Sequence, residues 1–416
     1  MSQRPYNTGV SHVDKQADSP IHVKSSGRIA ILLASLAALG PFSIDTYLPS
    51  LHEIGQTLGA SQLEVQQTIS IYLLSFAVMT LWHGAISDRF GRRNVILASL
   101  MLFGIASAGC MLSTSIGQLW FWRGMQGVSS GAGIVISRAI VRDLYDGADA
   151  QRLMSRITMM FALAPAVAPV IGGWLQVGFG WRSVFAFLVL STVALLITCW
   201  KHLPETLPVE KRRSLQPAYL GRTYWKVLSS KKFLLACAAL SLNFAGFFIY
   251  ILSAPVFLMR HLGISETGFL WLFGPAMCGL ICGSWSAGRM AGKLTPERSI
   301  IVGYLIMGSA GLINVGLNLS LPPAVPWSVL PLFIYTFGMS IAMPSLTLLA
   351  LDPFANERGL AASCQTFFQS GFNGLAATII APALWGSTLT LAFGMLGLMS
   401  LGAFAAYAHA RTKSLN

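Results

Sequence analysis

The sequence predicts an all-α integral membrane protein. Of its 416 residues, 54% are hydrophobic and only 10% are charged, whereas soluble domains carry about 25% charged residues. The apolar residues form long runs, and a membrane-spanning helix needs about 20 such residues. The net charge of +13 does not indicate nucleic-acid binding, because the lysines and arginines fall in short gaps between the apolar runs.

Twelve runs have the length of a transmembrane helix, and a basic gap divides them six and six. This division predicts a cytoplasmic tail at 1–27, six-helix bundles at 28–203 and 233–410, a cytoplasmic linker at 204–232 and a cytoplasmic tail at 411–416. The linker is expected to lie at an anionic leaflet or to bind a partner. The predicted spans are 28–50, 63–86, 93–113, 118–141, 153–177, 181–203, 233–258, 268–290, 299–320, 327–350, 359–384 and 388–410.

Basic residues predict that both termini lie in the cytoplasm. In this orientation Arg182 and Arg260 fall in or beside outer loops and Arg123 lies within a span. Removing these three from the 28 lysines and arginines leaves 25 on the cytoplasmic side. The opposite orientation reverses this bias, which contradicts the usual retention of positive charge inside.

A charged loop with the spacing G-x-x-x-D-R-x-G-R-R follows the second span. Its glycines permit a tight turn, and its acid is favoured at a helix N-terminus. The motif residues are Gly84, Asp88, Arg89, Gly91, Arg92 and Arg93.

This loop resembles the signature loop of the major facilitator superfamily, which acts as a cytoplasmic latch between two pseudo-symmetric bundles. The resemblance implies that Asp88 faces the start of the eleventh span near Gly359. It also makes Arg92 and Asp143, at the end of the fourth span, candidate latch partners.

Two further runs resemble motifs of that superfamily. The fourth span carries Arg123-Gly124-Met125-Gln126-Gly127, and the resemblance associates this arginine with proton coupling. The fifth span resembles the motif of the antiporter branch, which implies a bent helix packed closely against the other bundle. Its motif residues are Pro165, Pro169, Gly172 and Gly173.

A finer resemblance is to the bicyclomycin-resistance (Bcr/CflA) drug-efflux family. It rests on residues 43–49 of the first span, on Arg142-Asp143-Leu144-Tyr145 and on Pro204-Glu205-Thr206-Leu207. The resemblance implies a monomeric, twelve-helix antiporter of the bacterial inner membrane. It would export drug-like small molecules in exchange for protons and need no cofactor beyond the proton gradient.

Asp45 and Arg123 are the deepest charged residues in the predicted spans. A charge at the bilayer centre costs at least about 3 kcal/mol. Each lies five residues from the predicted outer end of its span, or about 7 Å deep, so depth allows an ion pair. We expect Asp45 to bind the proton and Arg123 to tune the proton affinity of this site. The alternative is a fixed structural Asp–Arg pair.

Eight polar residues are candidates to line a central substrate cavity. Three of them recur every fourth residue in the eleventh span and share one face, where helix–helix hydrogen bonding explains them as well as ligand contact does. The eight are Tyr47, Tyr72, Asn243, Tyr250, Tyr335, Gln365, Gln369 and Asn373.

Other functions fit the sequence less well. A narrow-specificity, proton-coupled carrier of a nucleobase, nucleoside or amino-acid derivative uses the same scaffold and remains an alternative. An ATP-driven pump requires a G-x-x-x-x-G-K-[ST] phosphate loop, which the sequence lacks. No catalytic or metal-ligating constellation is evident, and Cys278 and Cys282 are interpreted as packing residues.

Overall fold

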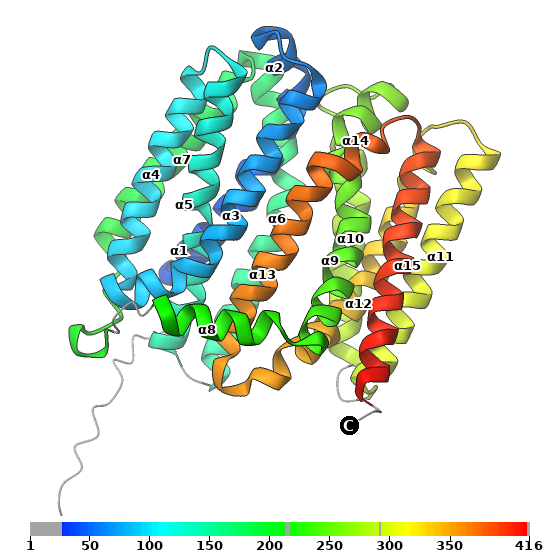
Figure 1. Cartoon of the computed structure of the whole chain (residues 1–416). Coiled ribbons are helices and arrows are strands. Elements are labelled where there is room, and N and C mark those ends of the chain that lie inside the picture. The colour runs from blue at the N-terminus through cyan, green and yellow to red at the C-terminus, as the bar shows by residue number, and fades with distance from the viewer. Residues whose placement is uncertain (1–26, 146, 213–216, 291–292, 414–416) are drawn as a thin grey trace, which may run out of the picture.

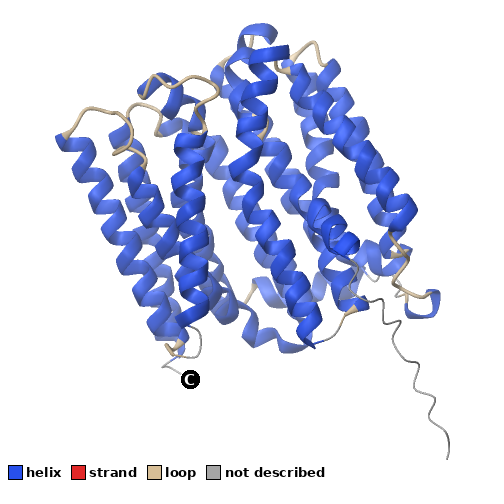
Figure 2. Cartoon of the chain, turned by 180° about the vertical axis from the view of Figure 1, so that it is seen from behind, coloured by secondary structure: helices blue, strands red, loops and turns tan. Residues whose placement is uncertain are grey.

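A computed structural model describes residues 27–145, 147–212, 217–290 and 293–413. Within these ranges the chain forms helices joined by short loops and no β-strand (Figure 2). Apart from Gly27, the predicted N-terminal tail lies outside the described residues, as do the last three residues of the C-terminal tail. The all-α prediction is therefore confirmed for the described part of the chain.

The helices follow the predicted spans closely. In chain order they are α1 (Gly27–Asp45), η1 (Leu48–Ser50), α2 (Leu51–Leu58), α3 (Gln62–Phe90), α4 (Arg92–Leu112), α5 (Ile116–Leu144), α6 (Gly147–Phe179), α7 (Arg182–His202), η2 (Val209–Lys211), α8 (Pro217–Leu228), α9 (Lys231–Leu252), η3 (Val256–His261), α10 (Leu270–Met290), α11 (Pro296–Ser320), α12 (Leu330–Leu351), η4 (Asp352–Glu357), α13 (Arg358–Leu375), η5 (Ala376–Ile380), α14 (Ala381–Ala383) and α15 (Thr388–Lys413).

Nine helical segments among the described residues are long and apolar enough to cross a membrane. They coincide with nine of the predicted spans. The other three predicted spans, 118–141, 153–177 and 359–384, correspond to α5, α6 and α13. The first of these helices carries Arg123, the second carries two prolines and the third carries the amide stripe.

The long helices run side by side between two ends of the molecule (Figure 1). We call these the α2 end, where α2 and α14 lie, and the α8 end, where α8 and the C-terminus lie. In one set of helices, α5 packs against α3, α4 and α1; in the other, α12 packs against α10 and α11, and α9 packs against α15. The contacts of α3 with α13 and of α6 with α10 join the two sets.

The first predicted span is interrupted directly after Asp45. The helix α1 ends there, and the chain continues through a turn into η1 and α2. The Thr46 hydroxyl donates to the carbonyl oxygen of Phe42 at 2.6 Å, and Pro49 has no backbone N–H to continue a helix. Asp45 therefore lies at the carboxyl end of α1 rather than inside a continuous helix.

Glycines let α5 approach its neighbours closely. A Cβ atom on Gly127 would clash with the backbone oxygen of Tyr72 on α3, and one on Gly133 would clash with that of Leu36 on α1. Small residues at such crossings are the usual means of close helix packing in lipid. As a result, α5 lies between α1 and α3 and carries Arg123 into the space between them.

We expect Gly133→Ala to lower the free energy of unfolding by about 1–3 kcal/mol, because the added methyl group must displace the α1 backbone. The matched control is Gly117→Ala in the same helix, where nothing lies within 4 Å of the added Cβ. The control should be neutral or stabilising by up to about 1 kcal/mol. Thermal unfolding of both purified variants measures the difference, and equal melting temperatures would contradict the predicted packing.

Candidate functional site

Arg123 is completely buried among aromatic rings. Its side chain is 0% exposed, and its guanidinium carbon lies 4.7 Å from the ring centroid of Tyr47 and 4.5 Å from that of Tyr72. Its Nη1 donates to Oε1 of Gln126 at 2.7 Å, whereas Nε and Nη2 have no hydrogen-bond partner among the described residues. Nη1 also donates to the carbonyl oxygen of Ser43 at 3.5 Å. Two cation–π contacts and two hydrogen bonds thus surround a cation that retains unused donors.

Polar side chains from α1, α3 and α4 hold this arginine cluster in place. The Tyr72 hydroxyl accepts from the Ser43 hydroxyl at 2.9 Å and donates to the Gly40 carbonyl oxygen at 3.1 Å. The Tyr47 hydroxyl bonds to the Thr68 hydroxyl at 2.9 Å. The hydrogen bonds at each hydroxyl therefore fix the orientation of the ring, and the face of the ring contacts the guanidinium.

Gln126 completes the cluster on the side of α4. Its amide nitrogen donates to the Ser107 hydroxyl at 2.7 Å, and its amide oxygen accepts from Arg123. Gln126 belongs to the fourth-span motif, but the motif by itself assigns it no role. Its spacing from Arg123 is three residues, which places both side chains on one helix face and would have identified it.

Asp45 lies near this cluster without pairing to its cation. Its side chain is buried, with 5% exposure, and among the described residues no hydrogen bond or ion pair to its carboxylate occurs. The link between them is the backbone of Ser43, two residues before Asp45, whose carbonyl oxygen accepts from Nη1 of Arg123 at 3.5 Å. The predicted depths of Asp45 and Arg123 allowed an ion pair. In this structure, however, Tyr47, Tyr72 and Gln126 surround the guanidinium of Arg123.

Three of the predicted cavity residues are bonded inside the second set of helices. The Tyr335 hydroxyl donates to the Asn243 carbonyl oxygen at 2.9 Å, and the Asn243 amide donates to the Tyr304 hydroxyl at 2.8 Å. The Tyr250 hydroxyl accepts from the Asn314 amide at 2.7 Å. All three are fully buried, so their polar groups join α9 to α11 and α12.

The amide stripe of α13 has fewer partners. Gln365 and Gln369 are half-buried, and no hydrogen bond joins their side chains to the described residues. Asn373 is 6% exposed, and its Oδ1 has no partner among the described residues. These unpaired amides lie on the helix that packs against both α3 and α9.

The predicted latch residues gather at the α8 end. Arg92 is paired with Asp88, its Nε lies 3.2 Å from Oδ2 of Asp143, and its Nη1 donates to the Ser87 hydroxyl at 2.6 Å. Arg93 donates to the backbone oxygen of Trp200 at 2.7 Å. Arg92 is therefore the centre of the charge network, and Asp143 is one of its partners.

Residues after α7 complete this network. The Thr206 hydroxyl donates to Asp143 at 2.8 Å, and the Glu205 carboxylate accepts from the backbone N–H of Arg92 at 2.9 Å. Glu205 also leaves no room for a side chain at Gly91, whose φ is +93°. The sequence indicates Glu205 only through a resemblance, because a contact over 113 residues has no local signal.

Asp88 and Gly359 face a common cavity of about 750 Å³ at the α8 end. The side chain of Asp88 is 42% exposed. The helix α8 lines this cavity through Tyr219, Leu220 and Tyr224. The Tyr224 hydroxyl donates to the Leu81 carbonyl oxygen on α3, so α8 covers part of the cavity.

The glycine pair of α6 lies at a contact between the two sets of helices. A Cβ on Gly172 would clash with the backbone oxygen of Thr46, and one on Gly173 would clash with that of Glu266, just before α10. Pro169 is buried and Pro165 is half-buried in the same helix. The helix α6 is thus held between the end of α1 and the start of α10.

Comparison with known proteins shows the family. The model of the Major Facilitator Superfamily matches residues 32–377. The chain belongs to this superfamily. It is therefore a membrane transporter and not an enzyme, and a transporter of this superfamily recognises small molecules.

Several curated superfamily members resemble the chain over most of their length. It is 31% identical to the uncharacterized MFS-type transporter YdgK of Bacillus subtilis, covering 80% of this chain and 84% of that protein. It is 27% identical to multidrug resistance protein D of Escherichia coli, with coverages of 89% and 93%. It is 30% identical to the bicyclomycin resistance protein homolog of Haemophilus influenzae, with coverages of 70% and 73%.

Solved structures agree on the fold. The POT family transporter PepTSo superposes with a TM-score of 0.72 at 14% sequence identity, covering 94% of this chain and 99% of that one. At this identity the likeness concerns the fold alone. The predicted resemblance to drug-efflux members of the superfamily is confirmed by the curated relatives.

We expect Arg92→Gln to lower the free energy of unfolding by about 1.5–3 kcal/mol, because the change leaves Asp143 and Asp88 without their cation. Arg89→Gln is the matched control, since Arg89 is exposed and its guanidinium lies against the Phe90 ring. The control should change stability by less than about 0.5 kcal/mol. Thermal unfolding in detergent compares the two, and an unaffected Arg92→Gln variant would contradict this role.

Proposed function

We propose that this chain exports drug-like small molecules across the bacterial inner membrane in exchange for protons. One observation carries the proposal: Asp45 is a buried carboxyl group without a counter-charge among the described residues, at the end of the helix whose Ser43 carbonyl oxygen accepts from the buried Arg123, which has unused donors. A charged carboxylate in such a place is costly, and taking up a proton removes that cost. Asp45 is the proton carrier in this proposal.

Arg123 supplies the second state of the proton cycle. Its Nε and Nη2 have no partner among the described residues, and both are buried. A shift of α1 relative to α5 would bring the carboxylate toward these donors and favour the charged form. Proton uptake and release then follow from whether Asp45 is isolated or paired, and alternating access supplies the two arrangements.

The orientation follows from the basic residues. The α8 end carries Arg92, Arg93, Arg138 and Arg142, so we place it in the cytoplasm together with both termini.

The proposed transporter has twelve spans in bundles 28–203 and 233–410, which are joined by the linker 204–232. The contacts α3–α13 and α6–α10 are those that would change between inward-open and outward-open states. One chain contains all these parts, which supports a monomer.

The substrate class is supported by the curated relatives. Their names attribute multidrug resistance to one and bicyclomycin resistance to another, and a third, from Pseudomonas aeruginosa, is named for chloramphenicol resistance. These names concern unrelated compounds. We therefore expect several structurally unrelated drugs to raise the melting temperature of the purified protein. Stabilisation by one class of metabolite alone would favour the narrow-specificity carrier instead.

We expect Asp45→Asn to abolish drug uptake driven by a proton gradient into everted vesicles, because an amide cannot carry the proton. Drug binding, measured on the purified variant, should persist. Glu210→Gln is the matched control, since Glu210 is exposed in η2, and it should transport normally. Undiminished proton-driven uptake by Asp45→Asn would refute the role of Asp45, whereas loss of both folding and binding would indicate a structural role.

A further inference from the structure

A second cavity lies at the α2 end, away from the arginine cluster. It has a volume of about 660 Å³, within the range of about 300–1,000 Å³ that is typical of small-molecule sites. Its walls come from segments far apart in the chain: residues 51–66 of α2 and α3, residues 252–260 around η3, and Trp385 after α14. None of Asp45, Arg123 and the eight predicted cavity residues lines it.

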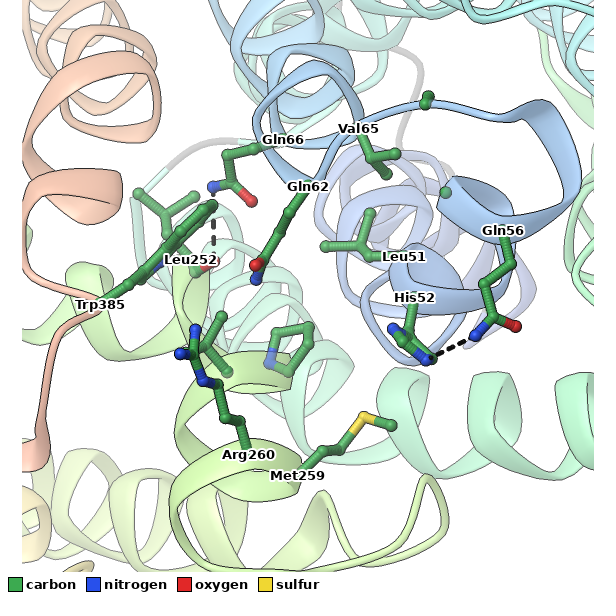
Figure 3. A pocket seen from close by; sticks show the side chains of 14 residues that line it. Leu51, His52, Gln56, Gln62, Val65, Gln66, Leu252, Met259, Arg260 and Trp385 are labelled. Carbon is green, nitrogen blue, oxygen red and sulfur yellow. Dashed lines mark hydrogen bonds between the residues drawn. The ribbon is translucent and has the colours of Figure 1, made fainter.

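One side of this cavity is apolar and contains an oriented aromatic ring. The Trp385 indole nitrogen donates to the Ser253 hydroxyl at 3.2 Å, and His261 bonds to the Trp385 carbonyl oxygen at 3.0 Å. Met259 and Val65 line the same space, as Figure 3 shows. A fixed indole ring among aliphatic side chains is suited to a flat apolar group.

The polar side chains that line the cavity are one arginine, three glutamines and one histidine. Figure 3 shows Arg260 and Gln62 reaching toward the space in front of Trp385. Gln66 bridges the two sets of helices by donating to the Leu252 carbonyl oxygen at 3.3 Å. Arg260 is exposed, and no ion pair joins it to any acid in the described ranges. Its guanidinium is therefore free to receive a carboxylate in two parallel hydrogen bonds.

Acidic side chains are absent from the described lining of the cavity. The two nearest carboxylates in sequence are used elsewhere. Glu53 accepts from the backbone N–H of Trp181 at 2.9 Å, and Glu64 accepts from the backbone and hydroxyl of Ser61 at 2.8 and 2.7 Å. The charge of the described lining thus comes from Arg260, with His52 as the only other ionisable side chain.

We propose that this cavity is a binding site for a small organic anion that carries a flat apolar body. The carboxylate would lie against Arg260 and Gln62, and the flat body would lie against Trp385. In the orientation proposed above the site faces the outside of the cell, yet the binding itself does not depend on that orientation or on proton coupling. A ligand here would contact both sides of the Gln66–Leu252 bridge.

The test is isothermal titration of the purified full-length chain with three naphthalene derivatives of one shape. They are 2-naphthoate, the neutral 2-naphthamide and the cationic 2-naphthylmethylammonium. We expect the anion to bind about tenfold or more tightly than the other two, since a charged hydrogen bond is lost with each of them. Equal binding of all three, or no binding of the anion at millimolar concentration, would overturn the proposal.

Substitutions test whether the anion binds in this cavity. Arg260→Gln should weaken 2-naphthoate binding about tenfold, and Arg260→Lys should retain part of it because the charge remains. Arg289→Gln is the matched control, an exposed arginine whose guanidinium carbon lies 3.7 Å from the Trp285 ring centroid, outside the cavity. It should leave binding unchanged. Unchanged affinity in Arg260→Gln would overturn the proposal.

Asp45→Asn separates this proposal from the transport proposal. It should retain full 2-naphthoate binding even though it loses proton-driven transport. If Asp45→Asn abolished 2-naphthoate binding and Arg260→Gln did not, the anion would bind at the central site and the proposed outer site would be refuted. Failure of transport in wild-type vesicles, by contrast, would leave the binding result standing.

Discussion

The burial of Arg123 determines how the first helices are arranged. A charge that is 0% exposed must be compensated by protein groups, and here the compensation comes from two helices and from the turn after α1. Tyr47 follows α1, Tyr72 lies on α3, and Gln126 lies on α5 with its amide fixed by Ser107 of α4. These groups contact the guanidinium only because glycines on α5 allow close approach to α1 and α3. Close packing and charge compensation therefore depend on each other.

The second charge network, at the α8 end, has a different physical basis. Arg92 is mostly buried, with its side chain 10% exposed, and it is neutralised by nearby carboxylates rather than by aromatic rings. Glu205 ties the segment after α7 to the start of α4. Every described partner of Arg92 lies in the first half of the chain. Any latch to the second half therefore acts through the cavity that Asp88 shares with Gly359, or through α8, where Lys226 pairs with Glu357 at 3.1 Å.

Local sequence patterns predicted the fold better than the site. Apolar runs located the helices because burial in lipid depends on composition along one segment. The spacing of the charged loop accounts for the pair of Asp88 and Arg92 for a similar reason, since the two are four residues apart. Asp143, 51 residues from Arg92, was expected as a partner only from the resemblance. The estimate of depth treats the first span as one continuous helix, whereas α1 ends at Asp45 and the chain continues into η1. Depth also does not specify which way a side chain points around its helix axis.

The partners of the polar residues in the spans could not be predicted from the sequence, because the sequence does not specify which way each side chain points. A tyrosine or asparagine in an apolar run signals that some partner exists, but the partner lies on another helix. Tyr250 bonds to Asn314, 64 residues away, and Tyr335 bonds to the backbone at Asn243, 92 residues away. Tyr47 and Tyr72, which are expected in a substrate cavity, present their ring faces to Arg123.

The interruption of α1 links the proposed proton site to the contact between the two sets of helices. Thr46 directly follows Asp45, and its backbone oxygen touches Gly172 of α6. The next residue, Gly173, touches the backbone at Glu266 before α10. Glycine at both positions leaves no side chain to absorb a displacement. A change in the position of Asp45 on gaining or losing a proton would therefore act on the α6–α10 contact through two backbone contacts, which is the coupling that an exchanger requires.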